Sequence, residues 1–135
     1  MNILAIGLAS VAQFSLGMVW YGAVFGKLWG TIHGFDQCTK EEQQAMMAKM
    51  GPYYALQFVV TVVTTVVLAV LISHVHDYSG YVLALLVWIG FVVPTQVADV
   101  IFGGTQPRWM LQKMMILAGG SLLFLMTAAA VLQAF

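Results

Sequence analysis

Four long apolar runs occupy most of this chain, and each is close to the length that a helix needs to cross a membrane. About 20 apolar residues carry a helix across the hydrocarbon core of a bilayer. The runs extend over about residues 3–25, 53–72, 81–102 and 110–134. We expect helices, because a helix satisfies its own backbone groups in lipid, whereas the strands of a membrane barrel are shorter and alternate in polarity.

The composition excludes a water-soluble domain. Hydrophobic residues make up 61% of the 135 residues and charged residues only 7%, whereas soluble domains are about 45–50% apolar and about 25% charged. The four spans leave no room for a second domain, so residues 1–135 are predicted to form a single transmembrane domain. The formal net charge is zero, which offers no basic face to nucleic acid. The expected partner is the lipid bilayer.

The one sizeable polar stretch lies between the first two runs, at about residues 27–51. Thr39 and Glu42 form the Thr-x-x-Glu pattern of a helix capping box. From Lys40 to Met50, polar residues on one side accompany alanine and methionine residues on the other. This pattern predicts a short amphipathic helix at the membrane interface. The predicted fold class is therefore all-α, an integral membrane four-helix bundle with a short interfacial helix between the first two spans.

The basic residues define an orientation. All five fall in or beside the loops after the first and third runs, namely Lys27, Lys40, Lys49, Arg108 and Lys113. Loops rich in lysine and arginine stay in the cytoplasm. The loop at about residues 27–51 is therefore predicted to be cytoplasmic, with both termini outside.

The most distinctive stretch of the sequence runs from Gly17 to Trp29, GMVWYGAVFGKLW. Four glycines recur every four residues, namely Gly22, Gly26, Gly30 and Gly34, which on a helix makes a ridge that lets backbones approach closely. We expect helix packing or subunit association at this motif. The alternative is a surface for a lipid headgroup, with aromatic walls and Lys27 as the anion partner. The predicted interface residues are Trp20, Tyr21, Gly22, Phe25, Gly26, Trp29 and Gly30.

This motif resembles the opening signature of a family of small bacterial membrane proteins labelled domain of unknown function 1761. The stretch from Phe91 to Gly103 is also similar to the family's pattern. In the family, the position of Asp99 is often Asn and a Phe-Glu-Gly-Arg element follows, whereas here Phe102-Gly103-Gly104-Thr105 lacks the acid. The resemblance implies four helices, one domain and a multi-pass protein of the bacterial inner membrane. It implies no activity.

Polar side chains inside the spans are the candidates for a pathway. Asp99 is the only carboxylate in a predicted span, and Thr95 and Gln96 lie three or four residues before it, on one helix face. Acids inside a membrane are often functional. Here the alternatives are a proton- or ligand-linked role, and a structural hydrogen bond or ion pair with Arg108. Gln13 in the first span is expected to bond a neighbouring helix, and it could line a polar core with Gln96.

A metal site and an active site find little support in the sequence. His74, His76 and Asp77 carry groups that bind zinc or copper, but one short loop supplies too few ligands. The sequence has no recognisable nucleophile–base pair and no phosphate-binding loop. We therefore expect no catalytic residues, no cofactor and no metal.

Three functional hypotheses follow from these observations, and the first two are the main ones. The leading hypothesis is a non-enzymatic structural or accessory module that associates with copies of itself or with another membrane protein. The alternative is a small oligomeric channel or transporter with a polar path at Thr95, Gln96 and Asp99. A membrane enzyme or a binder of an amphiphile is the third hypothesis.

Overall fold

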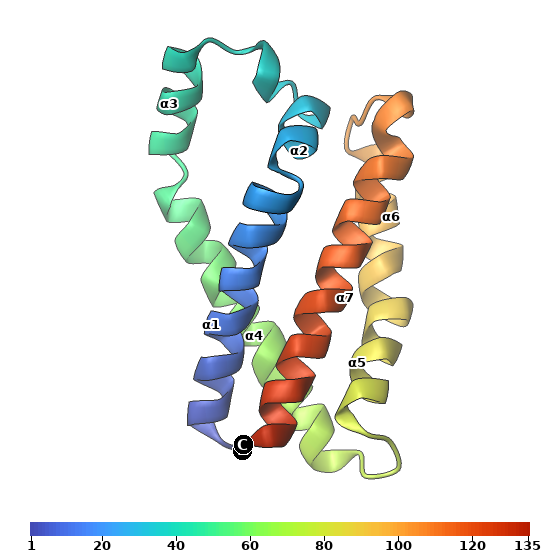
Figure 1. The fold of residues 1–135 in the computed structure, drawn as a ribbon. Coiled ribbons are helices and arrows are strands. Elements are labelled where there is room, and N and C mark those ends of the chain that lie inside the picture. Colours follow the sequence, from blue (N-terminus) through green and yellow to red (C-terminus); the bar gives the residue numbers. More distant parts are fainter.

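The computed structural model describes residues 1–135 and contains helices but no strands (Figure 1). Four helical stretches are long and apolar enough to cross a membrane, at Ile3–Val24, Gly51–His74, Gly80–Phe102 and Pro107–Ala134. The predicted all-α, four-span fold is confirmed. Only 17 of the 135 residues are buried. Many large apolar side chains are exposed, which suits a lipid surrounding.

The first and third spans are each interrupted by a π-helical segment. Helix α1 (Ile3–Met18) continues into a π segment at Val19–Val24. Helix α5 (Gly80–Val87) continues through Trp88–Val92 into helix α6 (Val93–Phe102). Such wide turns are rare and bend the helix or re-aim its side chains.

Proline accounts for the second of these segments. Pro94 has no N–H and cannot donate to the carbonyl four residues before it. Just before it, the N–H of Val93 donates to the carbonyl of Trp88, five residues back. No proline follows the first segment, where the N–H of Phe25 donates to the carbonyl of Trp20 over 3.0 Å. There the chain leaves helical geometry at Phe25, whose φ and ψ are −117° and 11°, and resumes as helix α2 (Gly26–Ile32).

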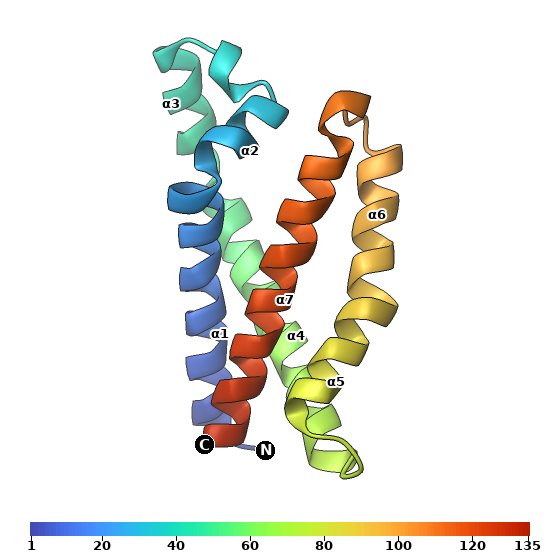
Figure 2. The ribbon, with the colours of Figure 1, turned by 45° about the vertical axis from the view of Figure 1, so that its right-hand side comes forward.

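The second and fourth spans are uninterrupted. Helix α4 (Gly51–His74) begins with Pro52 in its first turn, and helix α7 (Met110–Ala134) follows a short 3₁₀ turn at Pro107–Trp109. Helix α7 packs against α1, α4, α5 and α6, and it runs through the middle of the bundle in both ribbon views (Figure 1, Figure 2). Small residues at its contacts let the helices approach closely. The core cluster consists of Ala9, Leu68, Ala84, Leu125, Ala128 and Ala129.

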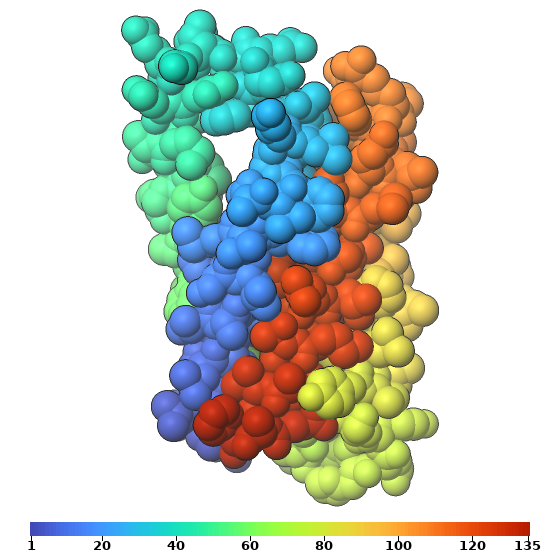
Figure 3. All heavy atoms as spheres, viewed as in Figure 1, coloured from blue at the N-terminus to red at the C-terminus, as the bar shows by residue number.

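The first loop contains the predicted short helix. Helix α3 (Lys40–Ala48) follows a 3₁₀ turn at Phe35–Gln37. The hydroxyl of Thr39 accepts a hydrogen bond from the N–H of Glu42 over 3.2 Å, as the capping pattern predicts. Below this loop the first span and α4 diverge, and Figure 3 shows an opening between them.

The chain ends meet at the opposite end of the bundle from this loop. The side-chain amide of Asn2 donates to the carbonyl of Phe135 over 3.2 Å, and both termini lie together in Figure 2. The first loop and the loop at residues 103–106 lie at the other end (Figure 1). All five basic residues therefore lie at one end of the molecule.

Candidate functional site

Trp20 of the distinctive motif is bound in a groove on α7. Its indole Nε1 donates to the carbonyl of Ile116 over 3.0 Å. The ring lies against Gly119 and Gly120, and a Cβ built at Gly120 would lie 2.7 Å from Trp20 Nε1. The two glycines of α7 therefore make the space that the indole fills.

Two further side chains bind the same turn of α7 from the third span. Trp88 Nε1 donates to the carbonyl of Ala118 over 2.9 Å and also contacts Ser121 Oγ at 3.2 Å. Gln96 Nε2 donates to the carbonyl of Leu117 over 3.3 Å, and its Oε1 accepts from Ser121 Oγ over 3.3 Å. Three consecutive carbonyls of α7, at residues 116–118, thus each accept a side-chain donor.

The residues that make these contacts around α7 are called the α7 collar here. They are Trp20, Trp88, Gln96, Gly119, Gly120 and Ser121. No buried side-chain nitrogen or oxygen of the protein lacks a hydrogen-bond partner. Since a ligand would need free donors or acceptors, the collar is suited to fastening three spans together. The acceptors of the collar could not be predicted, because they are backbone carbonyls, which no residue pattern distinguishes.

Gln13 belongs to a separate polar contact between α1 and α4. Its Nε2 donates to Thr65 Oγ1 over 2.7 Å and to the carbonyl of Ala9 over 3.1 Å. Both side chains are buried, with Gln13 5% and Thr65 0% exposed. Gln13 therefore forms the expected interhelical bond, but it does not share a polar core with Gln96.

Thr95 and Asp99 lie on the outer face of α6. Both are exposed, and the hydroxyl of Thr95 donates to the carbonyl of Phe91 over 2.7 Å. The structure holds no Asp99–Arg108 ion pair, since Arg108 Nε instead donates to Gln106 Oε1 over 3.0 Å. Gln96 faces α7, so one chain alone does not bring the three predicted pathway residues onto one path.

The predicted glycine ridge does not form a continuous helix surface. Phe25 breaks the helix, and Gly34 has a φ of +75° that ends α2. A Cβ at Gly22 would touch nothing within 4 Å, and one at Gly30 would meet only Phe35. Close approach occurs on α7, where Gly119 and Gly120 receive Trp20.

The aromatic residues of the motif stack on one another instead. Trp20 packs edge-on against Phe25 at 4.7 Å, and Tyr21 against Trp29 at 4.9 Å, both between ring centroids. Gly26 begins α2 beneath them. This stack stabilises the bend between the first span and α2.

The three weakly supported metal-ligand candidates, His74, His76 and Asp77, do not gather into a site. No three histidine, cysteine, aspartate or glutamate side chains lie close enough to hold a metal ion. His74 Nδ1 lies 2.9 Å from the carbonyl of Val70, in its own helix. His76 and Asp77 are exposed in the following loop.

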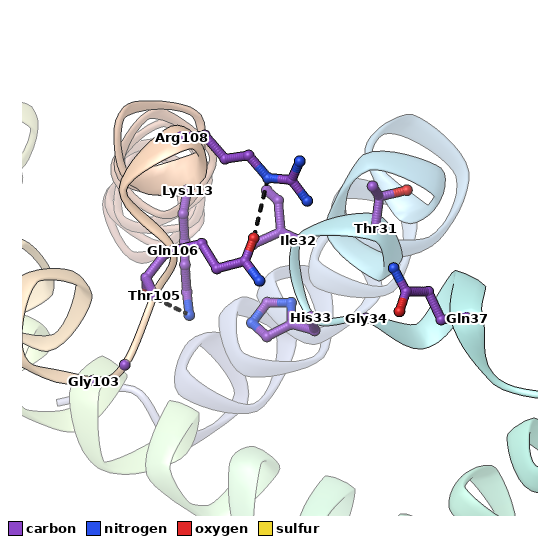
Figure 4. Close-up of a pocket in the computed structure, with 11 residues that line it drawn as sticks. Thr31, Ile32, His33, Gly34, Gln37, Gly103, Thr105, Gln106, Arg108 and Lys113 are labelled. Atoms are coloured by element: carbon purple, nitrogen blue, oxygen red, sulfur yellow. Dashed lines mark hydrogen bonds between the residues drawn. The ribbon is translucent and has the colours of Figure 1, made fainter.

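A polar pocket of about 330 Å³ opens at the basic end of the bundle (Figure 4). It lies between the end of α2 and the loop at residues 103–106. Its charged lining residues are Arg108 and Lys113, beside His33, and none of the lining residues is acidic. Sequence reasoning missed it, because residues about 80 positions apart form it, and their only shared signal was the clustering of basic residues. Its other lining residues are Thr31, Ile32, Gly34, Gln37, Gly103, Gly104, Thr105 and Gln106.

The family model of a protein family of unknown function, DUF1761, matches residues 4–133. The chain belongs to this family. The resemblance carried by residues 17–29 is thereby confirmed. No curated protein and no solved structure matches the chain. Since the family has no assigned function, what this DUF1761 protein does must be argued from its own contacts.

The single cysteine of this DUF1761 protein lies in the first loop. Cys38 is half-buried, and its Sγ lies 3.7 Å from the carbonyl oxygen of Gly34. Partial burial and the nearby Glu42 and Asp36 carboxylates raise the pKa of the Cys38 thiol. Each of these disfavours the thiolate, which is the form that reacts.

We expect Cys38 to be alkylated by iodoacetamide more slowly than a free cysteine at about pH 8, with a rate that rises at a higher pH than that of free cysteine. Glu42→Gln removes a negative charge next to the thiol, lowers its pKa and speeds the reaction at about pH 8. Glu41→Gln is the matched control, since Glu41 is not among the groups that raise this pKa. A thiol that titrates at or below the range of free cysteine would contradict this assignment.

Proposed function

We propose that this protein is a non-enzymatic membrane module that assembles with copies of itself through the exposed face of α6. The observation that carries the proposal is the place of Asp99. It lies in a candidate span, about three residues or roughly 4–5 Å from the end of α6, and it is exposed. A charge that faces lipid at this depth is costly unless it is paired or reaches the headgroups.

The residues around Asp99 form a surface that suits a neighbouring helix. Thr95, Asp99 and Phe102 recur at spacings of four and three, so they share one face of α6 (Val93–Phe102). Phe91 lies in the π segment just before this helix. Phe91 is 74% and Phe102 is 86% exposed. Polar groups flanked by aromatic side chains favour helix association in a membrane, because hydrogen bonds and packing drive it there.

A second copy also offers a charge partner at the right depth. In a two-fold dimer with its axis along the membrane normal, equal ends of both copies lie at the same level. The five basic residues gather at the end of the bundle where α6 terminates. The Asp99 carboxylate of one copy would therefore lie level with the cationic end of the other.

We expect Asp99→Asn to weaken self-association about ten-fold or more in detergent micelles, because a charge-assisted contact between copies is lost. The mass of the purified protein, measured by light scattering across a dilution series, checks this. Asp77→Asn, which removes an exposed acid from the opposite end, leaves association unchanged. Asp99→Asn also leaves the single chain folded, since Asp99 bonds no other residue of its own chain.

Cysteine crosslinking tests the same face without changing its charge. In a Cys38→Ser background, we expect Thr95→Cys to form a disulfide between two copies under mild oxidation. Val59→Cys, which is exposed on α4, is the control and remains uncrosslinked. If both cysteines crosslink equally, or neither does, the α6 interface is overturned.

A channel or transporter is the second candidate, and the same observation favours it. If several copies turned their α6 faces toward a common axis, Thr95 and Asp99 would line a path. Gln96 and Gln13 would not, because each is bonded within its own chain. Asp99→Asn separates the two functions, since a pathway role predicts loss of proton-linked flux in liposomes with the oligomer intact.

We propose that the basic end faces the cytoplasm of a bacterial inner membrane, with both termini outside. The support is the gathering of all five basic residues at one end, which the positive-inside rule assigns to the cytoplasm. In a Cys38→Ser background, a membrane-impermeant maleimide should label His76→Cys in intact cells. It should label Gln44→Cys only after the membrane is permeabilised. The reverse pattern would overturn the orientation.

A further inference from the structure

We infer that the polar pocket at the basic end is a binding site for a phosphate group. The pocket brings together Arg108 and Lys113 from the start of the fourth span and His33 from the end of α2 (Figure 4). None of its lining residues is acidic. Two cations therefore share one small cavity without a carboxylate to balance them.

Most N–H donors of Arg108 and Lys113 make no hydrogen bond within the chain. Arg108 bonds Gln106 through Nε alone, which leaves both terminal guanidinium nitrogens for a ligand. Lys113 Nζ makes one long hydrogen bond, 3.5 Å to Thr105 Oγ1, and lies 5.8 Å from the centroid of the Trp29 ring. Guanidinium and ammonium groups are the side chains that bind phosphate oxygens most often, Arg through two parallel bonds and Lys as a point charge.

The orientation of the neutral groups suits the same ligand. Gln106 Oε1 accepts from Arg108, so its amide nitrogen is the group that remains for the pocket. His33 Nδ1 lies 2.8 Å from the carbonyl of Trp29 and must donate to it, which leaves Nε2 for the pocket. Nε2 donates to a phosphate oxygen only when the ring is protonated, because it is an acceptor in the neutral ring. In Figure 4 the His33 ring and the Lys113 ammonium point into the space between α2 and the loop.

The backbone of the same loop adds donors. Gly103 has φ −89° and ψ 15°, and Gly104 has φ +78°. Successive right- and left-handed residues turn their N–H groups toward one side and form a concavity that favours anions. The N–H groups of Gly104 and Thr105 donate to no backbone carbonyl in the loop.

The position of the pocket limits which kind of molecule can supply the phosphate group. It lies at the end where the spans meet the loops, which is the level of lipid headgroups in a bilayer. The phosphate group is therefore either that of an anionic lipid or a free phosphate from solution. The inference does not depend on self-association, since every residue of the pocket comes from one chain.

Binding of short-chain ligands to the purified protein in neutral detergent tests the site. The probes are dioctanoyl phosphatidic acid, dioctanoyl phosphatidylcholine and inorganic phosphate, followed by calorimetry. We expect phosphatidic acid to bind at least ten-fold more tightly than phosphatidylcholine, whose choline offsets the charge. Competition by inorganic phosphate would assign the site to free phosphate, and its failure to compete would assign it to the lipid headgroup.

A charge-matched pair of variants separates the pocket from general attraction. Arg108→Gln with Lys113→Gln should lose at least ten-fold in affinity for the phosphate probe that binds. Lys40→Gln with Lys49→Gln removes the same charge from the same end, outside the pocket, and should change affinity less than two-fold. If the first pair fails to fold, His33→Ala, which alters an exposed residue, should still weaken binding. Equal losses in both pairs, or no binding of any phosphate probe to the wild type, would overturn the site.

Discussion

Gly120→Leu should abolish the native packing of the first span against α7. The Cβ alone would lie 2.7 Å from Trp20 Nε1 and 2.9 Å from Trp20 Cδ1. The indole is rigid and fixed by its bond to the Ile116 carbonyl, so it must leave the groove. Overpacking a close helix contact costs about 1–3 kcal/mol, occasionally more, and the lost indole bond adds about 0.5–1.5 kcal/mol.

Unfolding by sodium dodecyl sulfate in mixed micelles measures this loss. Gly7→Leu is the matched control, because a Cβ at Gly7 meets nothing within 4 Å, and it should leave the midpoint nearly unchanged. A second variant keeps the prediction testable if Gly120→Leu does not fold. Adding Trp20→Ala to Gly120→Leu should restore part of the stability, since it vacates the groove that the leucine needs. A Gly120→Leu protein as stable as Gly7→Leu would show that the groove does not hold Trp20.

Trp88→Ala, which alters the contact of the third span with α7, should lower the stability by a comparable amount. The indole of Trp88 donates to the Ala118 carbonyl and packs against the core cluster. Truncating a packed tryptophan to alanine typically costs about 3–5 kcal/mol. Trp88→Phe keeps most of the packing and removes only the donor, so we expect a loss of about 0.5–1.5 kcal/mol.

The same detergent titration, followed by circular dichroism, ranks these variants. Trp109→Ala is the control tryptophan, since its ring lies beside Arg108 outside the core cluster, and we expect a loss well below that of Trp88→Ala. If Trp88→Phe proves as damaging as Trp88→Ala, the hydrogen bond outweighs the packing. If neither variant shifts the midpoint, Trp88 does not fasten the third span to α7.

The four spans were predictable because hydropathy and length act locally along the chain. The α3 helix was predictable for the same reason, since Thr39 caps it through the N–H of Glu42, three residues away. The first span was expected to end at about residue 25, where the chain does leave helical geometry, but the glycine ridge required one continuous helix through this position. The glycine ridge was therefore wrong, as its regular spacing has meaning only on an unbroken helix.

The candidate sites were predicted less well, because they depend on which helix faces pack against each other in the folded chain. Gln13 was expected to bond a neighbouring helix, but its partner Thr65 lies in a span with many similar threonines. Gln96 and Asp99 are three residues apart, yet one binds α7 and the other points outward. The phosphate pocket needs His33 and Lys113 side by side, which only the folded chain provides.

The α7 collar also bears on how the protein is made. Helix α7 follows the other three spans in the chain, so these three enter the bilayer before their central neighbour has been synthesised. Until then the indole N–H groups of Trp20 and Trp88 and the amide of Gln96 have no acceptor on α7. Insertion and assembly are thus separate stages, and a nascent chain that stalls before residue 116 exposes three polar donors to lipid. Quality control in the membrane would meet such a chain as an incomplete bundle, which makes the arrival of α7 the step that commits these spans to their packing.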